Sequence, residues 1–384
     1  MTSIRTSNNP EMLEWAREEV GYTLEQAAHA IGVSVDKLKA AESGDRSLTL
    51  NQLRTAADKY NCPFGYFYLS KPPYKKSYKP VPDYRIEPGF IGVEHYRLNL
   101  EIKKARDRRL LYFDLLTSLD LEAEPFQPLP QSGMSIFGSP IRRRLGIADS
   151  EISSLDFDQV YSYWKTKIEN DGVLVYESQY IPEESGVIGV AIYYDVCPII
   201  LVKRGGSHNA RKLFTLLHEY AHLLKGQSAL NDVEAQSVSR PTSKEARLEA
   251  ECNLLAAEIL VPSENINRDD YIGLNPVQKM EHLANTFKVT YTTAAVCLRR
   301  LNLIDQLEFF HLLELRRKAN EEKRTKEDKE VKIPRENIMR LDIGRPMFNV
   351  VLQAYGSGVI DLFDASKILN LRVSKIDKLV SGIA

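Results

Sequence analysis

The sequence predicts an α+β protein of several domains, with its strands confined to one short part of the chain. Short helical patterns fill the first 70 of the 384 residues, β-rich runs lie between residues 173 and 204, and helical periodicity returns beyond residue 209. Strands gathered in one place and flanked by helices predict a small sheet packed beside helices. At about 100–200 residues per domain, this length allows two to four domains.

An all-α helix-turn-helix domain is predicted over residues 8–70, where helical patterns begin at capping residues and end at glycines. The run TLEQAAHAIGVSVDKLKAAESG resembles the two central helices of the phage-repressor-type (XRE) family. Its presumed recognition helix offers Ser34, Lys37 and Lys39 for contacts with DNA. Residues 11–60, however, hold 6 basic and 9 acidic side chains, a net charge of −3, and an acidic surface binds DNA weakly. DNA binding and protein binding therefore both stay open.

A run rich in proline and lysine predicts an extended linker over residues 71–93, because proline fits neither a helix interior nor a sheet. A charged helix over about residues 94–120 follows, and a second helix ends at Gly172. The next runs, VLVYES, GVIGVAIYYD and CPIILVKR, are predicted strands. They lead into two further helices, FTLLHEYAHLL and SKEARLEAECNLLAAEILVP.

The last third of the chain is predicted to be helical. Residues 276–303 have a helix, turn, helix pattern. The strongly charged stretch 304–335 predicts a second linker, and residues 336–384 regain apolar periodicity, which predicts a C-terminal helical module.

The strongest chemical motif is HEYAH, with His218 and His222 four residues apart. Residues at this spacing share one face of a helix, so both imidazoles can reach one metal ion. Glu219 lies about 100° round the helix from His218, where its carboxylate can act on a water molecule. Catalytic zinc commonly has three protein ligands, so a third ligand must come from another segment.

Helical geometry favours Glu249 as that third ligand. At 100° per residue, Ala256 and Leu260 lie within about 20° of Glu249, so its carboxylate faces an apolar surface where it needs a partner. Glu245 is the runner-up, because it lies about 40° from Glu249 but near the helix start. Asn253, one turn after Glu249, suits a hydrogen bond to a ligand histidine or a bond to the backbone.

These residues resemble the ImmA/IrrE metallopeptidases. ARKLFTLLHEYAHLL followed by LEAECNLLAAEILVP matches that family's HExxH helix and its downstream helix, with Cys252 and Leu255 in place of the usual alanine and phenylalanine. The resemblance implies a zincin-like HExxH metallopeptidase domain over residues 94–303. It also implies metal ligands His218, His222 and Glu249, with Glu219 as catalytic base.

The expected function is a zinc-dependent endopeptidase that cleaves a regulatory protein, and the resemblance implies a helix-turn-helix repressor of stress-response or mobile-element genes. Two histidines and a carboxylate also accept Mn²⁺. The alternative is a DNA-binding regulator whose peptidase-like domain is a sensor or scaffold. The four scattered cysteines form no disulfide framework, and no run reaches the about 20 apolar residues of a membrane helix. The sequence thus predicts a cytoplasmic protein without a membrane partner, of unknown oligomeric state.

Overall fold

The computed structural model describes seven stretches of the chain, which are residues 8–72, 95–130, 138–182, 185–204, 209–232, 244–324 and 341–376. The chain forms two compact units. The first unit contains the N-terminal residues up to 81 together with 86–107 and 180–186. The second unit contains residues 82–85, 108–179 and 187–384. From residue 73 onward, the predicted linker lies outside the described residues.

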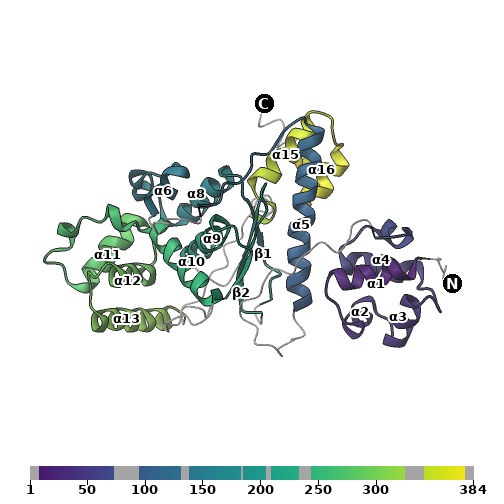
Figure 1. Ribbon diagram of the computed structural model, residues 1–384, viewed down its shortest axis with the longest axis horizontal. Helices are drawn as coiled ribbons and strands as arrows, with labels where there is room; N and C mark the ends of the chain where they lie inside the picture. The colour runs from purple at the N-terminus through teal and green to yellow at the C-terminus, as the bar shows by residue number, and fades with distance from the viewer. Residues whose placement is uncertain are drawn as a thin grey trace. The chain divides into compact units, whose positions relative to one another are not determined.

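The first unit is helical, as the sequence predicts (Figure 1). Its elements are α1 (Pro10–Glu19), α2 (Leu24–Ile31), α3 (Val35–Glu42), α4 (Leu50–Tyr60), the 3-10 helix η1 (Phe64–Tyr68) and the first half of α5 (His95–Ser118). The side chains of Thr23 and Thr49 cap α2 and α4 as partners in capping boxes, and Ser34 caps α3. Gly32 ends α2 with φ +76, a left-handed conformation that costs glycine little. The predicted capping residues of α2, α3 and α4 and the glycine end of α2 are therefore confirmed, whereas α1 and α3 end at the C-caps Val20 and Ser43, one residue before a glycine.

The core of the first unit is mainly apolar and includes a buried ion pair between α1 and α3. Leu13, Leu38 and Leu53 are fully buried and come from three different helices. Arg17 donates through Nε and Nη2 to the two carboxylate oxygens of Glu42, over 2.8 and 3.0 Å. This bidentate pair joins α1 to the end of α3 in a largely buried position, which makes it a specific link between the two helices.

The second unit is built around a four-stranded sheet in the order β1-β3-β2-β4. The strands are β1 (Leu174–Ser178), β2 (Val187–Ile192), β3 (Ile199–Lys203) and β4 (Ala229–Asp232). β1 and β3 run parallel, whereas β2 pairs antiparallel with both β3 and β4. The first three strands match the predicted β-rich runs, and β4 is an addition that the sequence patterns did not predict.

Helices lie to one side of this sheet and share one large apolar core with it (Figure 1). They are α6 (Gly138–Arg144), α7 (Asp149–Ser154), α8 (Phe157–Asn170), α9 (Asn209–Leu224), α10 (Lys244–Leu260), α11 (Pro276–Phe287), α12 (Tyr291–Arg300) and α13 (Gln306–Arg324), with the short 3-10 helices η2 (Ser263–Asn265) and η3 (Arg268–Tyr271). Helix α9 packs on β2 and β3 and on α8 and α10. This arrangement confirms the predicted α+β class.

The C-terminal part differs in detail from the sequence prediction. The stretch predicted as a charged linker, 304–335, begins with helix α13, and Leu312 of this helix is fully buried in the main core. Two later helices, α15 (Arg345–Gly356) and α16 (Leu362–Leu369), pack with the second half of α5 in a smaller apolar core. The proposed domain boundaries stay a prediction. No helix among the described residues has the length and apolar character needed to cross a membrane.

Candidate metal centre

The predicted ligands lie on α9 and α10, which pack against each other beside the sheet (Figure 1). His218 and His222 are fully buried one turn apart on α9. Ala256 and Ala257 of α10 are also buried, and small residues at a helix contact let two backbones approach closely. The α10 carboxylate of Glu249 can therefore reach the two imidazoles of α9.

Three donor atoms converge at this contact. Among the described residues, His218, His222 and Glu249 are the group of potential ligands whose atoms lie within 4.8 Å of one another. The two Nε2 atoms are 3.0 Å apart, and each lies 3.2 Å from a carboxylate oxygen of Glu249. Two imidazole nitrogens and one carboxylate form a donor set typical of catalytic zinc, so these residues fit a divalent metal ion.

Asn253 orients the first of these histidines. Its Oδ1 lies 2.8 Å from Nδ1 of His218. Because an amide oxygen accepts hydrogen bonds, Nδ1 of His218 carries the proton in this pair and Nε2 keeps its lone pair facing the site. The contact is of the kind that commonly fixes the tautomer of a metal-ligating histidine.

The carboxylate of Glu249 is strongly acidic in this setting. Burial would raise its pKa, but the contacts with the imidazoles of His218 and His222 outweigh that effect and lower the pKa to about 2. In the opposite direction, burial and the nearby Glu249 charge raise the pKa of the Cys252 thiol far above its usual value. Cys252 therefore stays a protonated thiol, and Glu249 is the negatively charged donor on α10.

Glu219 lies against strand β2 at a position that only glycine leaves open. A Cβ atom on Gly189 would lie 2.4 Å from Oε1 and 2.8 Å from Cγ of Glu219, and 2.7 Å from Cγ2 of Thr215. These separations are shorter than any ordinary contact between non-bonded heavy atoms. Gly189 thus allows the fully buried Glu219 to pack directly on the strand backbone. The motif spacing does not point to Gly189, although a glycine inside a strand pattern commonly signals close approach of another group.

Other polar side chains of α9 and α10 take different places. Glu251 is half-exposed and forms an ion pair with Lys225. The backbone of Glu245 lies in α10, but its side chain is outside the described residues. Tyr220, the residue after Glu219, is buried and donates to Asp171 over 2.7 Å. Its hydroxyl is therefore occupied in a separate polar contact.

A family model described as an IrrE N-terminal-like domain, from the M78 peptidases, matches residues 181–299. The match includes α9 and α10, whereas β1 and α8 of the same compact unit precede it. A helix-turn-helix model matches residues 13–67 and confirms that prediction for the first unit. No curated protein and no solved structure matches the chain.

The three side chains predicted to contact DNA lie at the start of α3 and on its first turns, and their contact with DNA stays a prediction. Ser34 caps α3 by accepting from the backbone N–H of Lys37 over 3.3 Å. The Lys37 ammonium donates to Gln52 over 3.0 Å, while Lys39 is exposed. Two residues apart on a helix means about 200° of rotation, so the two lysines point to different sides of α3.

Proposed function

We propose that this protein is a metal-dependent endopeptidase whose active site lies in the IrrE N-terminal-like domain. The observation that carries the proposal is the convergence of His218, His222 and Glu249 within 4.8 Å beside the buried Glu219. The family match to M78 peptidases supports the same chemistry. In this proposal the three converging residues hold the metal and Asn253 orients His218.

The proposed reaction is hydrolysis of a peptide bond. When bound, the metal would lower the pKa of a water molecule toward ~7 and polarise the scissile carbonyl group. Glu219 accepts the proton of the attacking water and passes it to the nitrogen of the leaving amine, which makes it a general base and then a general acid. Its fixed position against Gly189 holds the carboxylate for both transfers.

We propose Zn²⁺ as the metal, with Mn²⁺ as the competing candidate, because both accept two histidines and a carboxylate. Elemental analysis of the purified protein tests this choice. We expect about one Zn²⁺ per chain in the wild type and none in His218→Ala. His282→Ala is a matched control, because His282 is exposed and contacts the ring of Tyr271 instead of the site. Equal metal content in both variants would refute the assignment.

The proposed substrate is a cytoplasmic helix-turn-helix repressor whose cleavage switches on stress-response or mobile-element genes. The presence of a helix-turn-helix unit in the same chain supports this choice, since such a unit can also contact related proteins. Zn²⁺-loaded wild type, Glu219→Gln and the control Glu251→Gln are incubated with candidate repressors. We expect single-site cleavage by the wild type and by Glu251→Gln alone. If Glu219→Gln cleaves as fast as the wild type, the enzyme proposal fails.

A second candidate function is DNA binding by the first unit, favoured by the helix-turn-helix match over residues 13–67. Its net charge of −3 over residues 11–60 argues for weak phosphate contacts. Titration of the full chain with DNA from upstream of its own gene, at several salt concentrations, tests this function. Binding that weakens with salt and falls in Lys39→Ala would support it. No binding at low salt would leave protein contacts as the role of the first unit.

A further inference from the structure

A short segment, Leu341–Arg345, leads into α15, includes its first residue and lies against the outer strand β1 of the second unit. We call this segment the clasp. A Cβ atom on Gly344 of the clasp would lie 2.8 Å from the carbonyl oxygen of Val175 in β1 and 3.1 Å from Oε1 of Glu169 in α8. Among the strands of the described residues, β1 stands at one end of the sheet and pairs with β3. The clasp therefore covers an edge strand by direct contact of two backbones.

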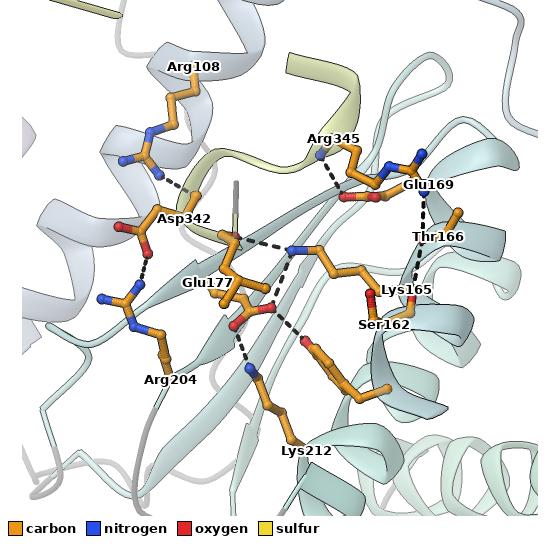
Figure 2. Close-up of polar contacts among 12 residues, drawn as sticks. Arg108, Ser162, Lys165, Thr166, Glu169, Glu177, Arg204, Lys212, Asp342 and Arg345 are labelled. Carbon is orange, nitrogen blue, oxygen red and sulfur yellow. Dashed lines mark hydrogen bonds and ion pairs between the residues drawn. The ribbon is translucent and has the colours of Figure 1, made fainter. Parts of the chain in front are cut away.

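Polar side chains from three separate parts of the unit form hydrogen bonds or ion pairs with the clasp (Figure 2). Arg108 of α5 donates to the carbonyl oxygen of Asp342 over 3.0 Å, and Arg204, just after β3, forms an ion pair with the Asp342 carboxylate. The remaining contacts come from α8. Lys165 donates to the carbonyl oxygen of Leu341 over 3.2 Å. Glu169 accepts from the backbone N–H of Arg345 over 3.1 Å, and Thr166 accepts from the Arg345 guanidinium over 3.0 Å. The buried Ile343 adds apolar contact with the core of α5, α15 and α16.

A buried ion cluster lies directly beneath the clasp. Figure 2 shows Glu177 of β1 between Lys165 and Lys212. The carboxylate of Glu177 is fully buried and forms ion pairs with both lysines, and Tyr161 donates to it over 3.1 Å. Burial alone would raise the pKa of Glu177, but the two lysines outweigh that effect and hold the pKa below its ordinary value. The carboxylate is therefore charged and depends on both ammonium groups.

This cluster connects the clasp to the candidate metal centre. Lys165 bonds both Glu177 and the carbonyl oxygen of Leu341, so it belongs to the cluster and to the clasp contact at once. Lys212 lies on α9, six residues before the proposed ligand His218. A continuous series of polar contacts thus runs from the clasp through Lys165, Glu177 and Lys212 into the N-terminal half of α9.

Such a cluster behaves as a unit, because buried charges tolerate the loss of one partner poorly. A buried ion pair adds little net stability against an apolar equivalent, but removing one partner leaves a charge without compensation. If the clasp leaves, Lys165 loses its carbonyl acceptor and Arg204 its carboxylate. The seated and released states of the clasp should therefore differ in the position of several side chains together, which is the property of a two-state element.

We propose that the clasp is a conformational latch that holds α15 and α16 against the rest of the second unit. Through Lys165, Glu177 and Lys212, it also keeps the N-terminal half of α9 in its metal-binding position. The fraction of molecules with the clasp seated and the affinity of the metal centre for its ion are then linked, so that a change in one changes the other. This inference uses the metal centre of the proposed function but not peptide cleavage.

Hydrogen exchange on the full chain tests the latch, with Gly344→Ala as the releasing variant. Gly358→Ala is the matched control, because both glycines have positive φ, +75 and +72, but a Cβ on Gly358 meets no atom within 4 Å. In Gly344→Ala we expect the amides of α15 and of the first two turns of α9 to exchange at least about tenfold faster than in the control. Zn²⁺ affinity, measured by chelator competition, should fall about three- to tenfold.

Lys212→Met separates the two halves of the proposal, since it cuts the connection to α9 and leaves the clasp contacts in place. We expect faster exchange in α9 with wild-type protection of α15. If Gly344→Ala fails to fold, Asp342→Asn replaces it, because this change keeps the side-chain shape and weakens the contact with Arg204 alone. Wild-type exchange of α15 in the releasing variant would refute the latch. Loss of α15 protection with unchanged α9 exchange and Zn²⁺ affinity would refute the link to the metal centre, and neither result depends on proteolysis.

Discussion

Replacing Gly189 by alanine should disable the proposed base while leaving the metal ligands intact. The new Cβ would lie 2.8 Å from Cγ of Glu219, about 0.7 Å inside the ~3.5 Å at which two carbon atoms attract, and closer still to Oε1. Either the Glu219 side chain or the whole of α9 must move by roughly that distance. Overpacking of this kind costs about 1–3 kcal/mol of unfolding free energy, or roughly 2–10 °C in melting temperature. A catalytic group displaced by about 1 Å loses on the order of a hundredfold in rate.

The assay compares Gly189→Ala with Gly356→Ala, a glycine in α15 whose Cβ would meet no atom within 4 Å. Both proteins are analysed for bound metal, for melting temperature and for cleavage of the repressor that the wild type cleaves. We expect both to bind one metal ion, and Gly189→Ala alone to lose cleavage through kcat with KM little changed. Wild-type kcat in Gly189→Ala would refute the close packing of Glu219 on β2. Loss of the metal would show that the change disturbs the whole of α9 instead of the base.

Three further predictions follow from named contacts. Glu249→Gln removes the charged donor whose pKa lies at about 2. The affinity of the protein for Zn²⁺, measured by chelator competition, should therefore fall at least about a hundredfold. An affinity within threefold of the wild type would show that this carboxylate is no ligand. Burial raises the pKa of Glu169 from 4.5 to about 7 despite the facing charges of Lys165 and Arg345, with Glu177 adding to the rise. The stability that depends on the neutral form of Glu169 is present below pH 4.5 and is lost as pH rises through about 7. The loss in unfolding free energy is on the order of 3 kcal/mol. Glu169→Gln should flatten this part of the pH profile when the unfolding free energy is measured by denaturant titration. Glu42→Gln breaks the bidentate pair between α1 and α3 and should destabilise the first unit by about 3 kcal/mol. This loss should appear as faster hydrogen exchange in α1–α4, with the exchange of α9 unchanged. Equal exchange in wild type and variant would mean that the pair contributes little to stability.

Much of the fold could be predicted from the sequence, because the relevant signals are local. Helix caps act over three or four residues, so Thr23, Ser34 and Gly32 marked the boundaries of α2 and α3 correctly. The three apolar runs gave β1, β2 and β3 for the same reason. Strand β4 escaped prediction, because it has four residues and owes its state to pairing with β2.

The sequence by itself determined that His218 and His222 share a helix face, since their spacing sets the angle between them. It also singled out Glu249, because the apolar pattern of α10 left that carboxylate on a buried face. Only the tertiary structure decided that the two helices meet with their donor atoms 3.0 to 3.2 Å apart, and that Gly189 gives Glu219 its place.

Only the tertiary structure also decided the ion pair between Arg17 and Glu42, which lie 25 residues apart in the chain. It likewise decided the contacts of the clasp above Glu177, which join distant parts of the chain. Contacts between distant residues depend on how all the helices and strands pack around a common core, and no local pattern records that packing.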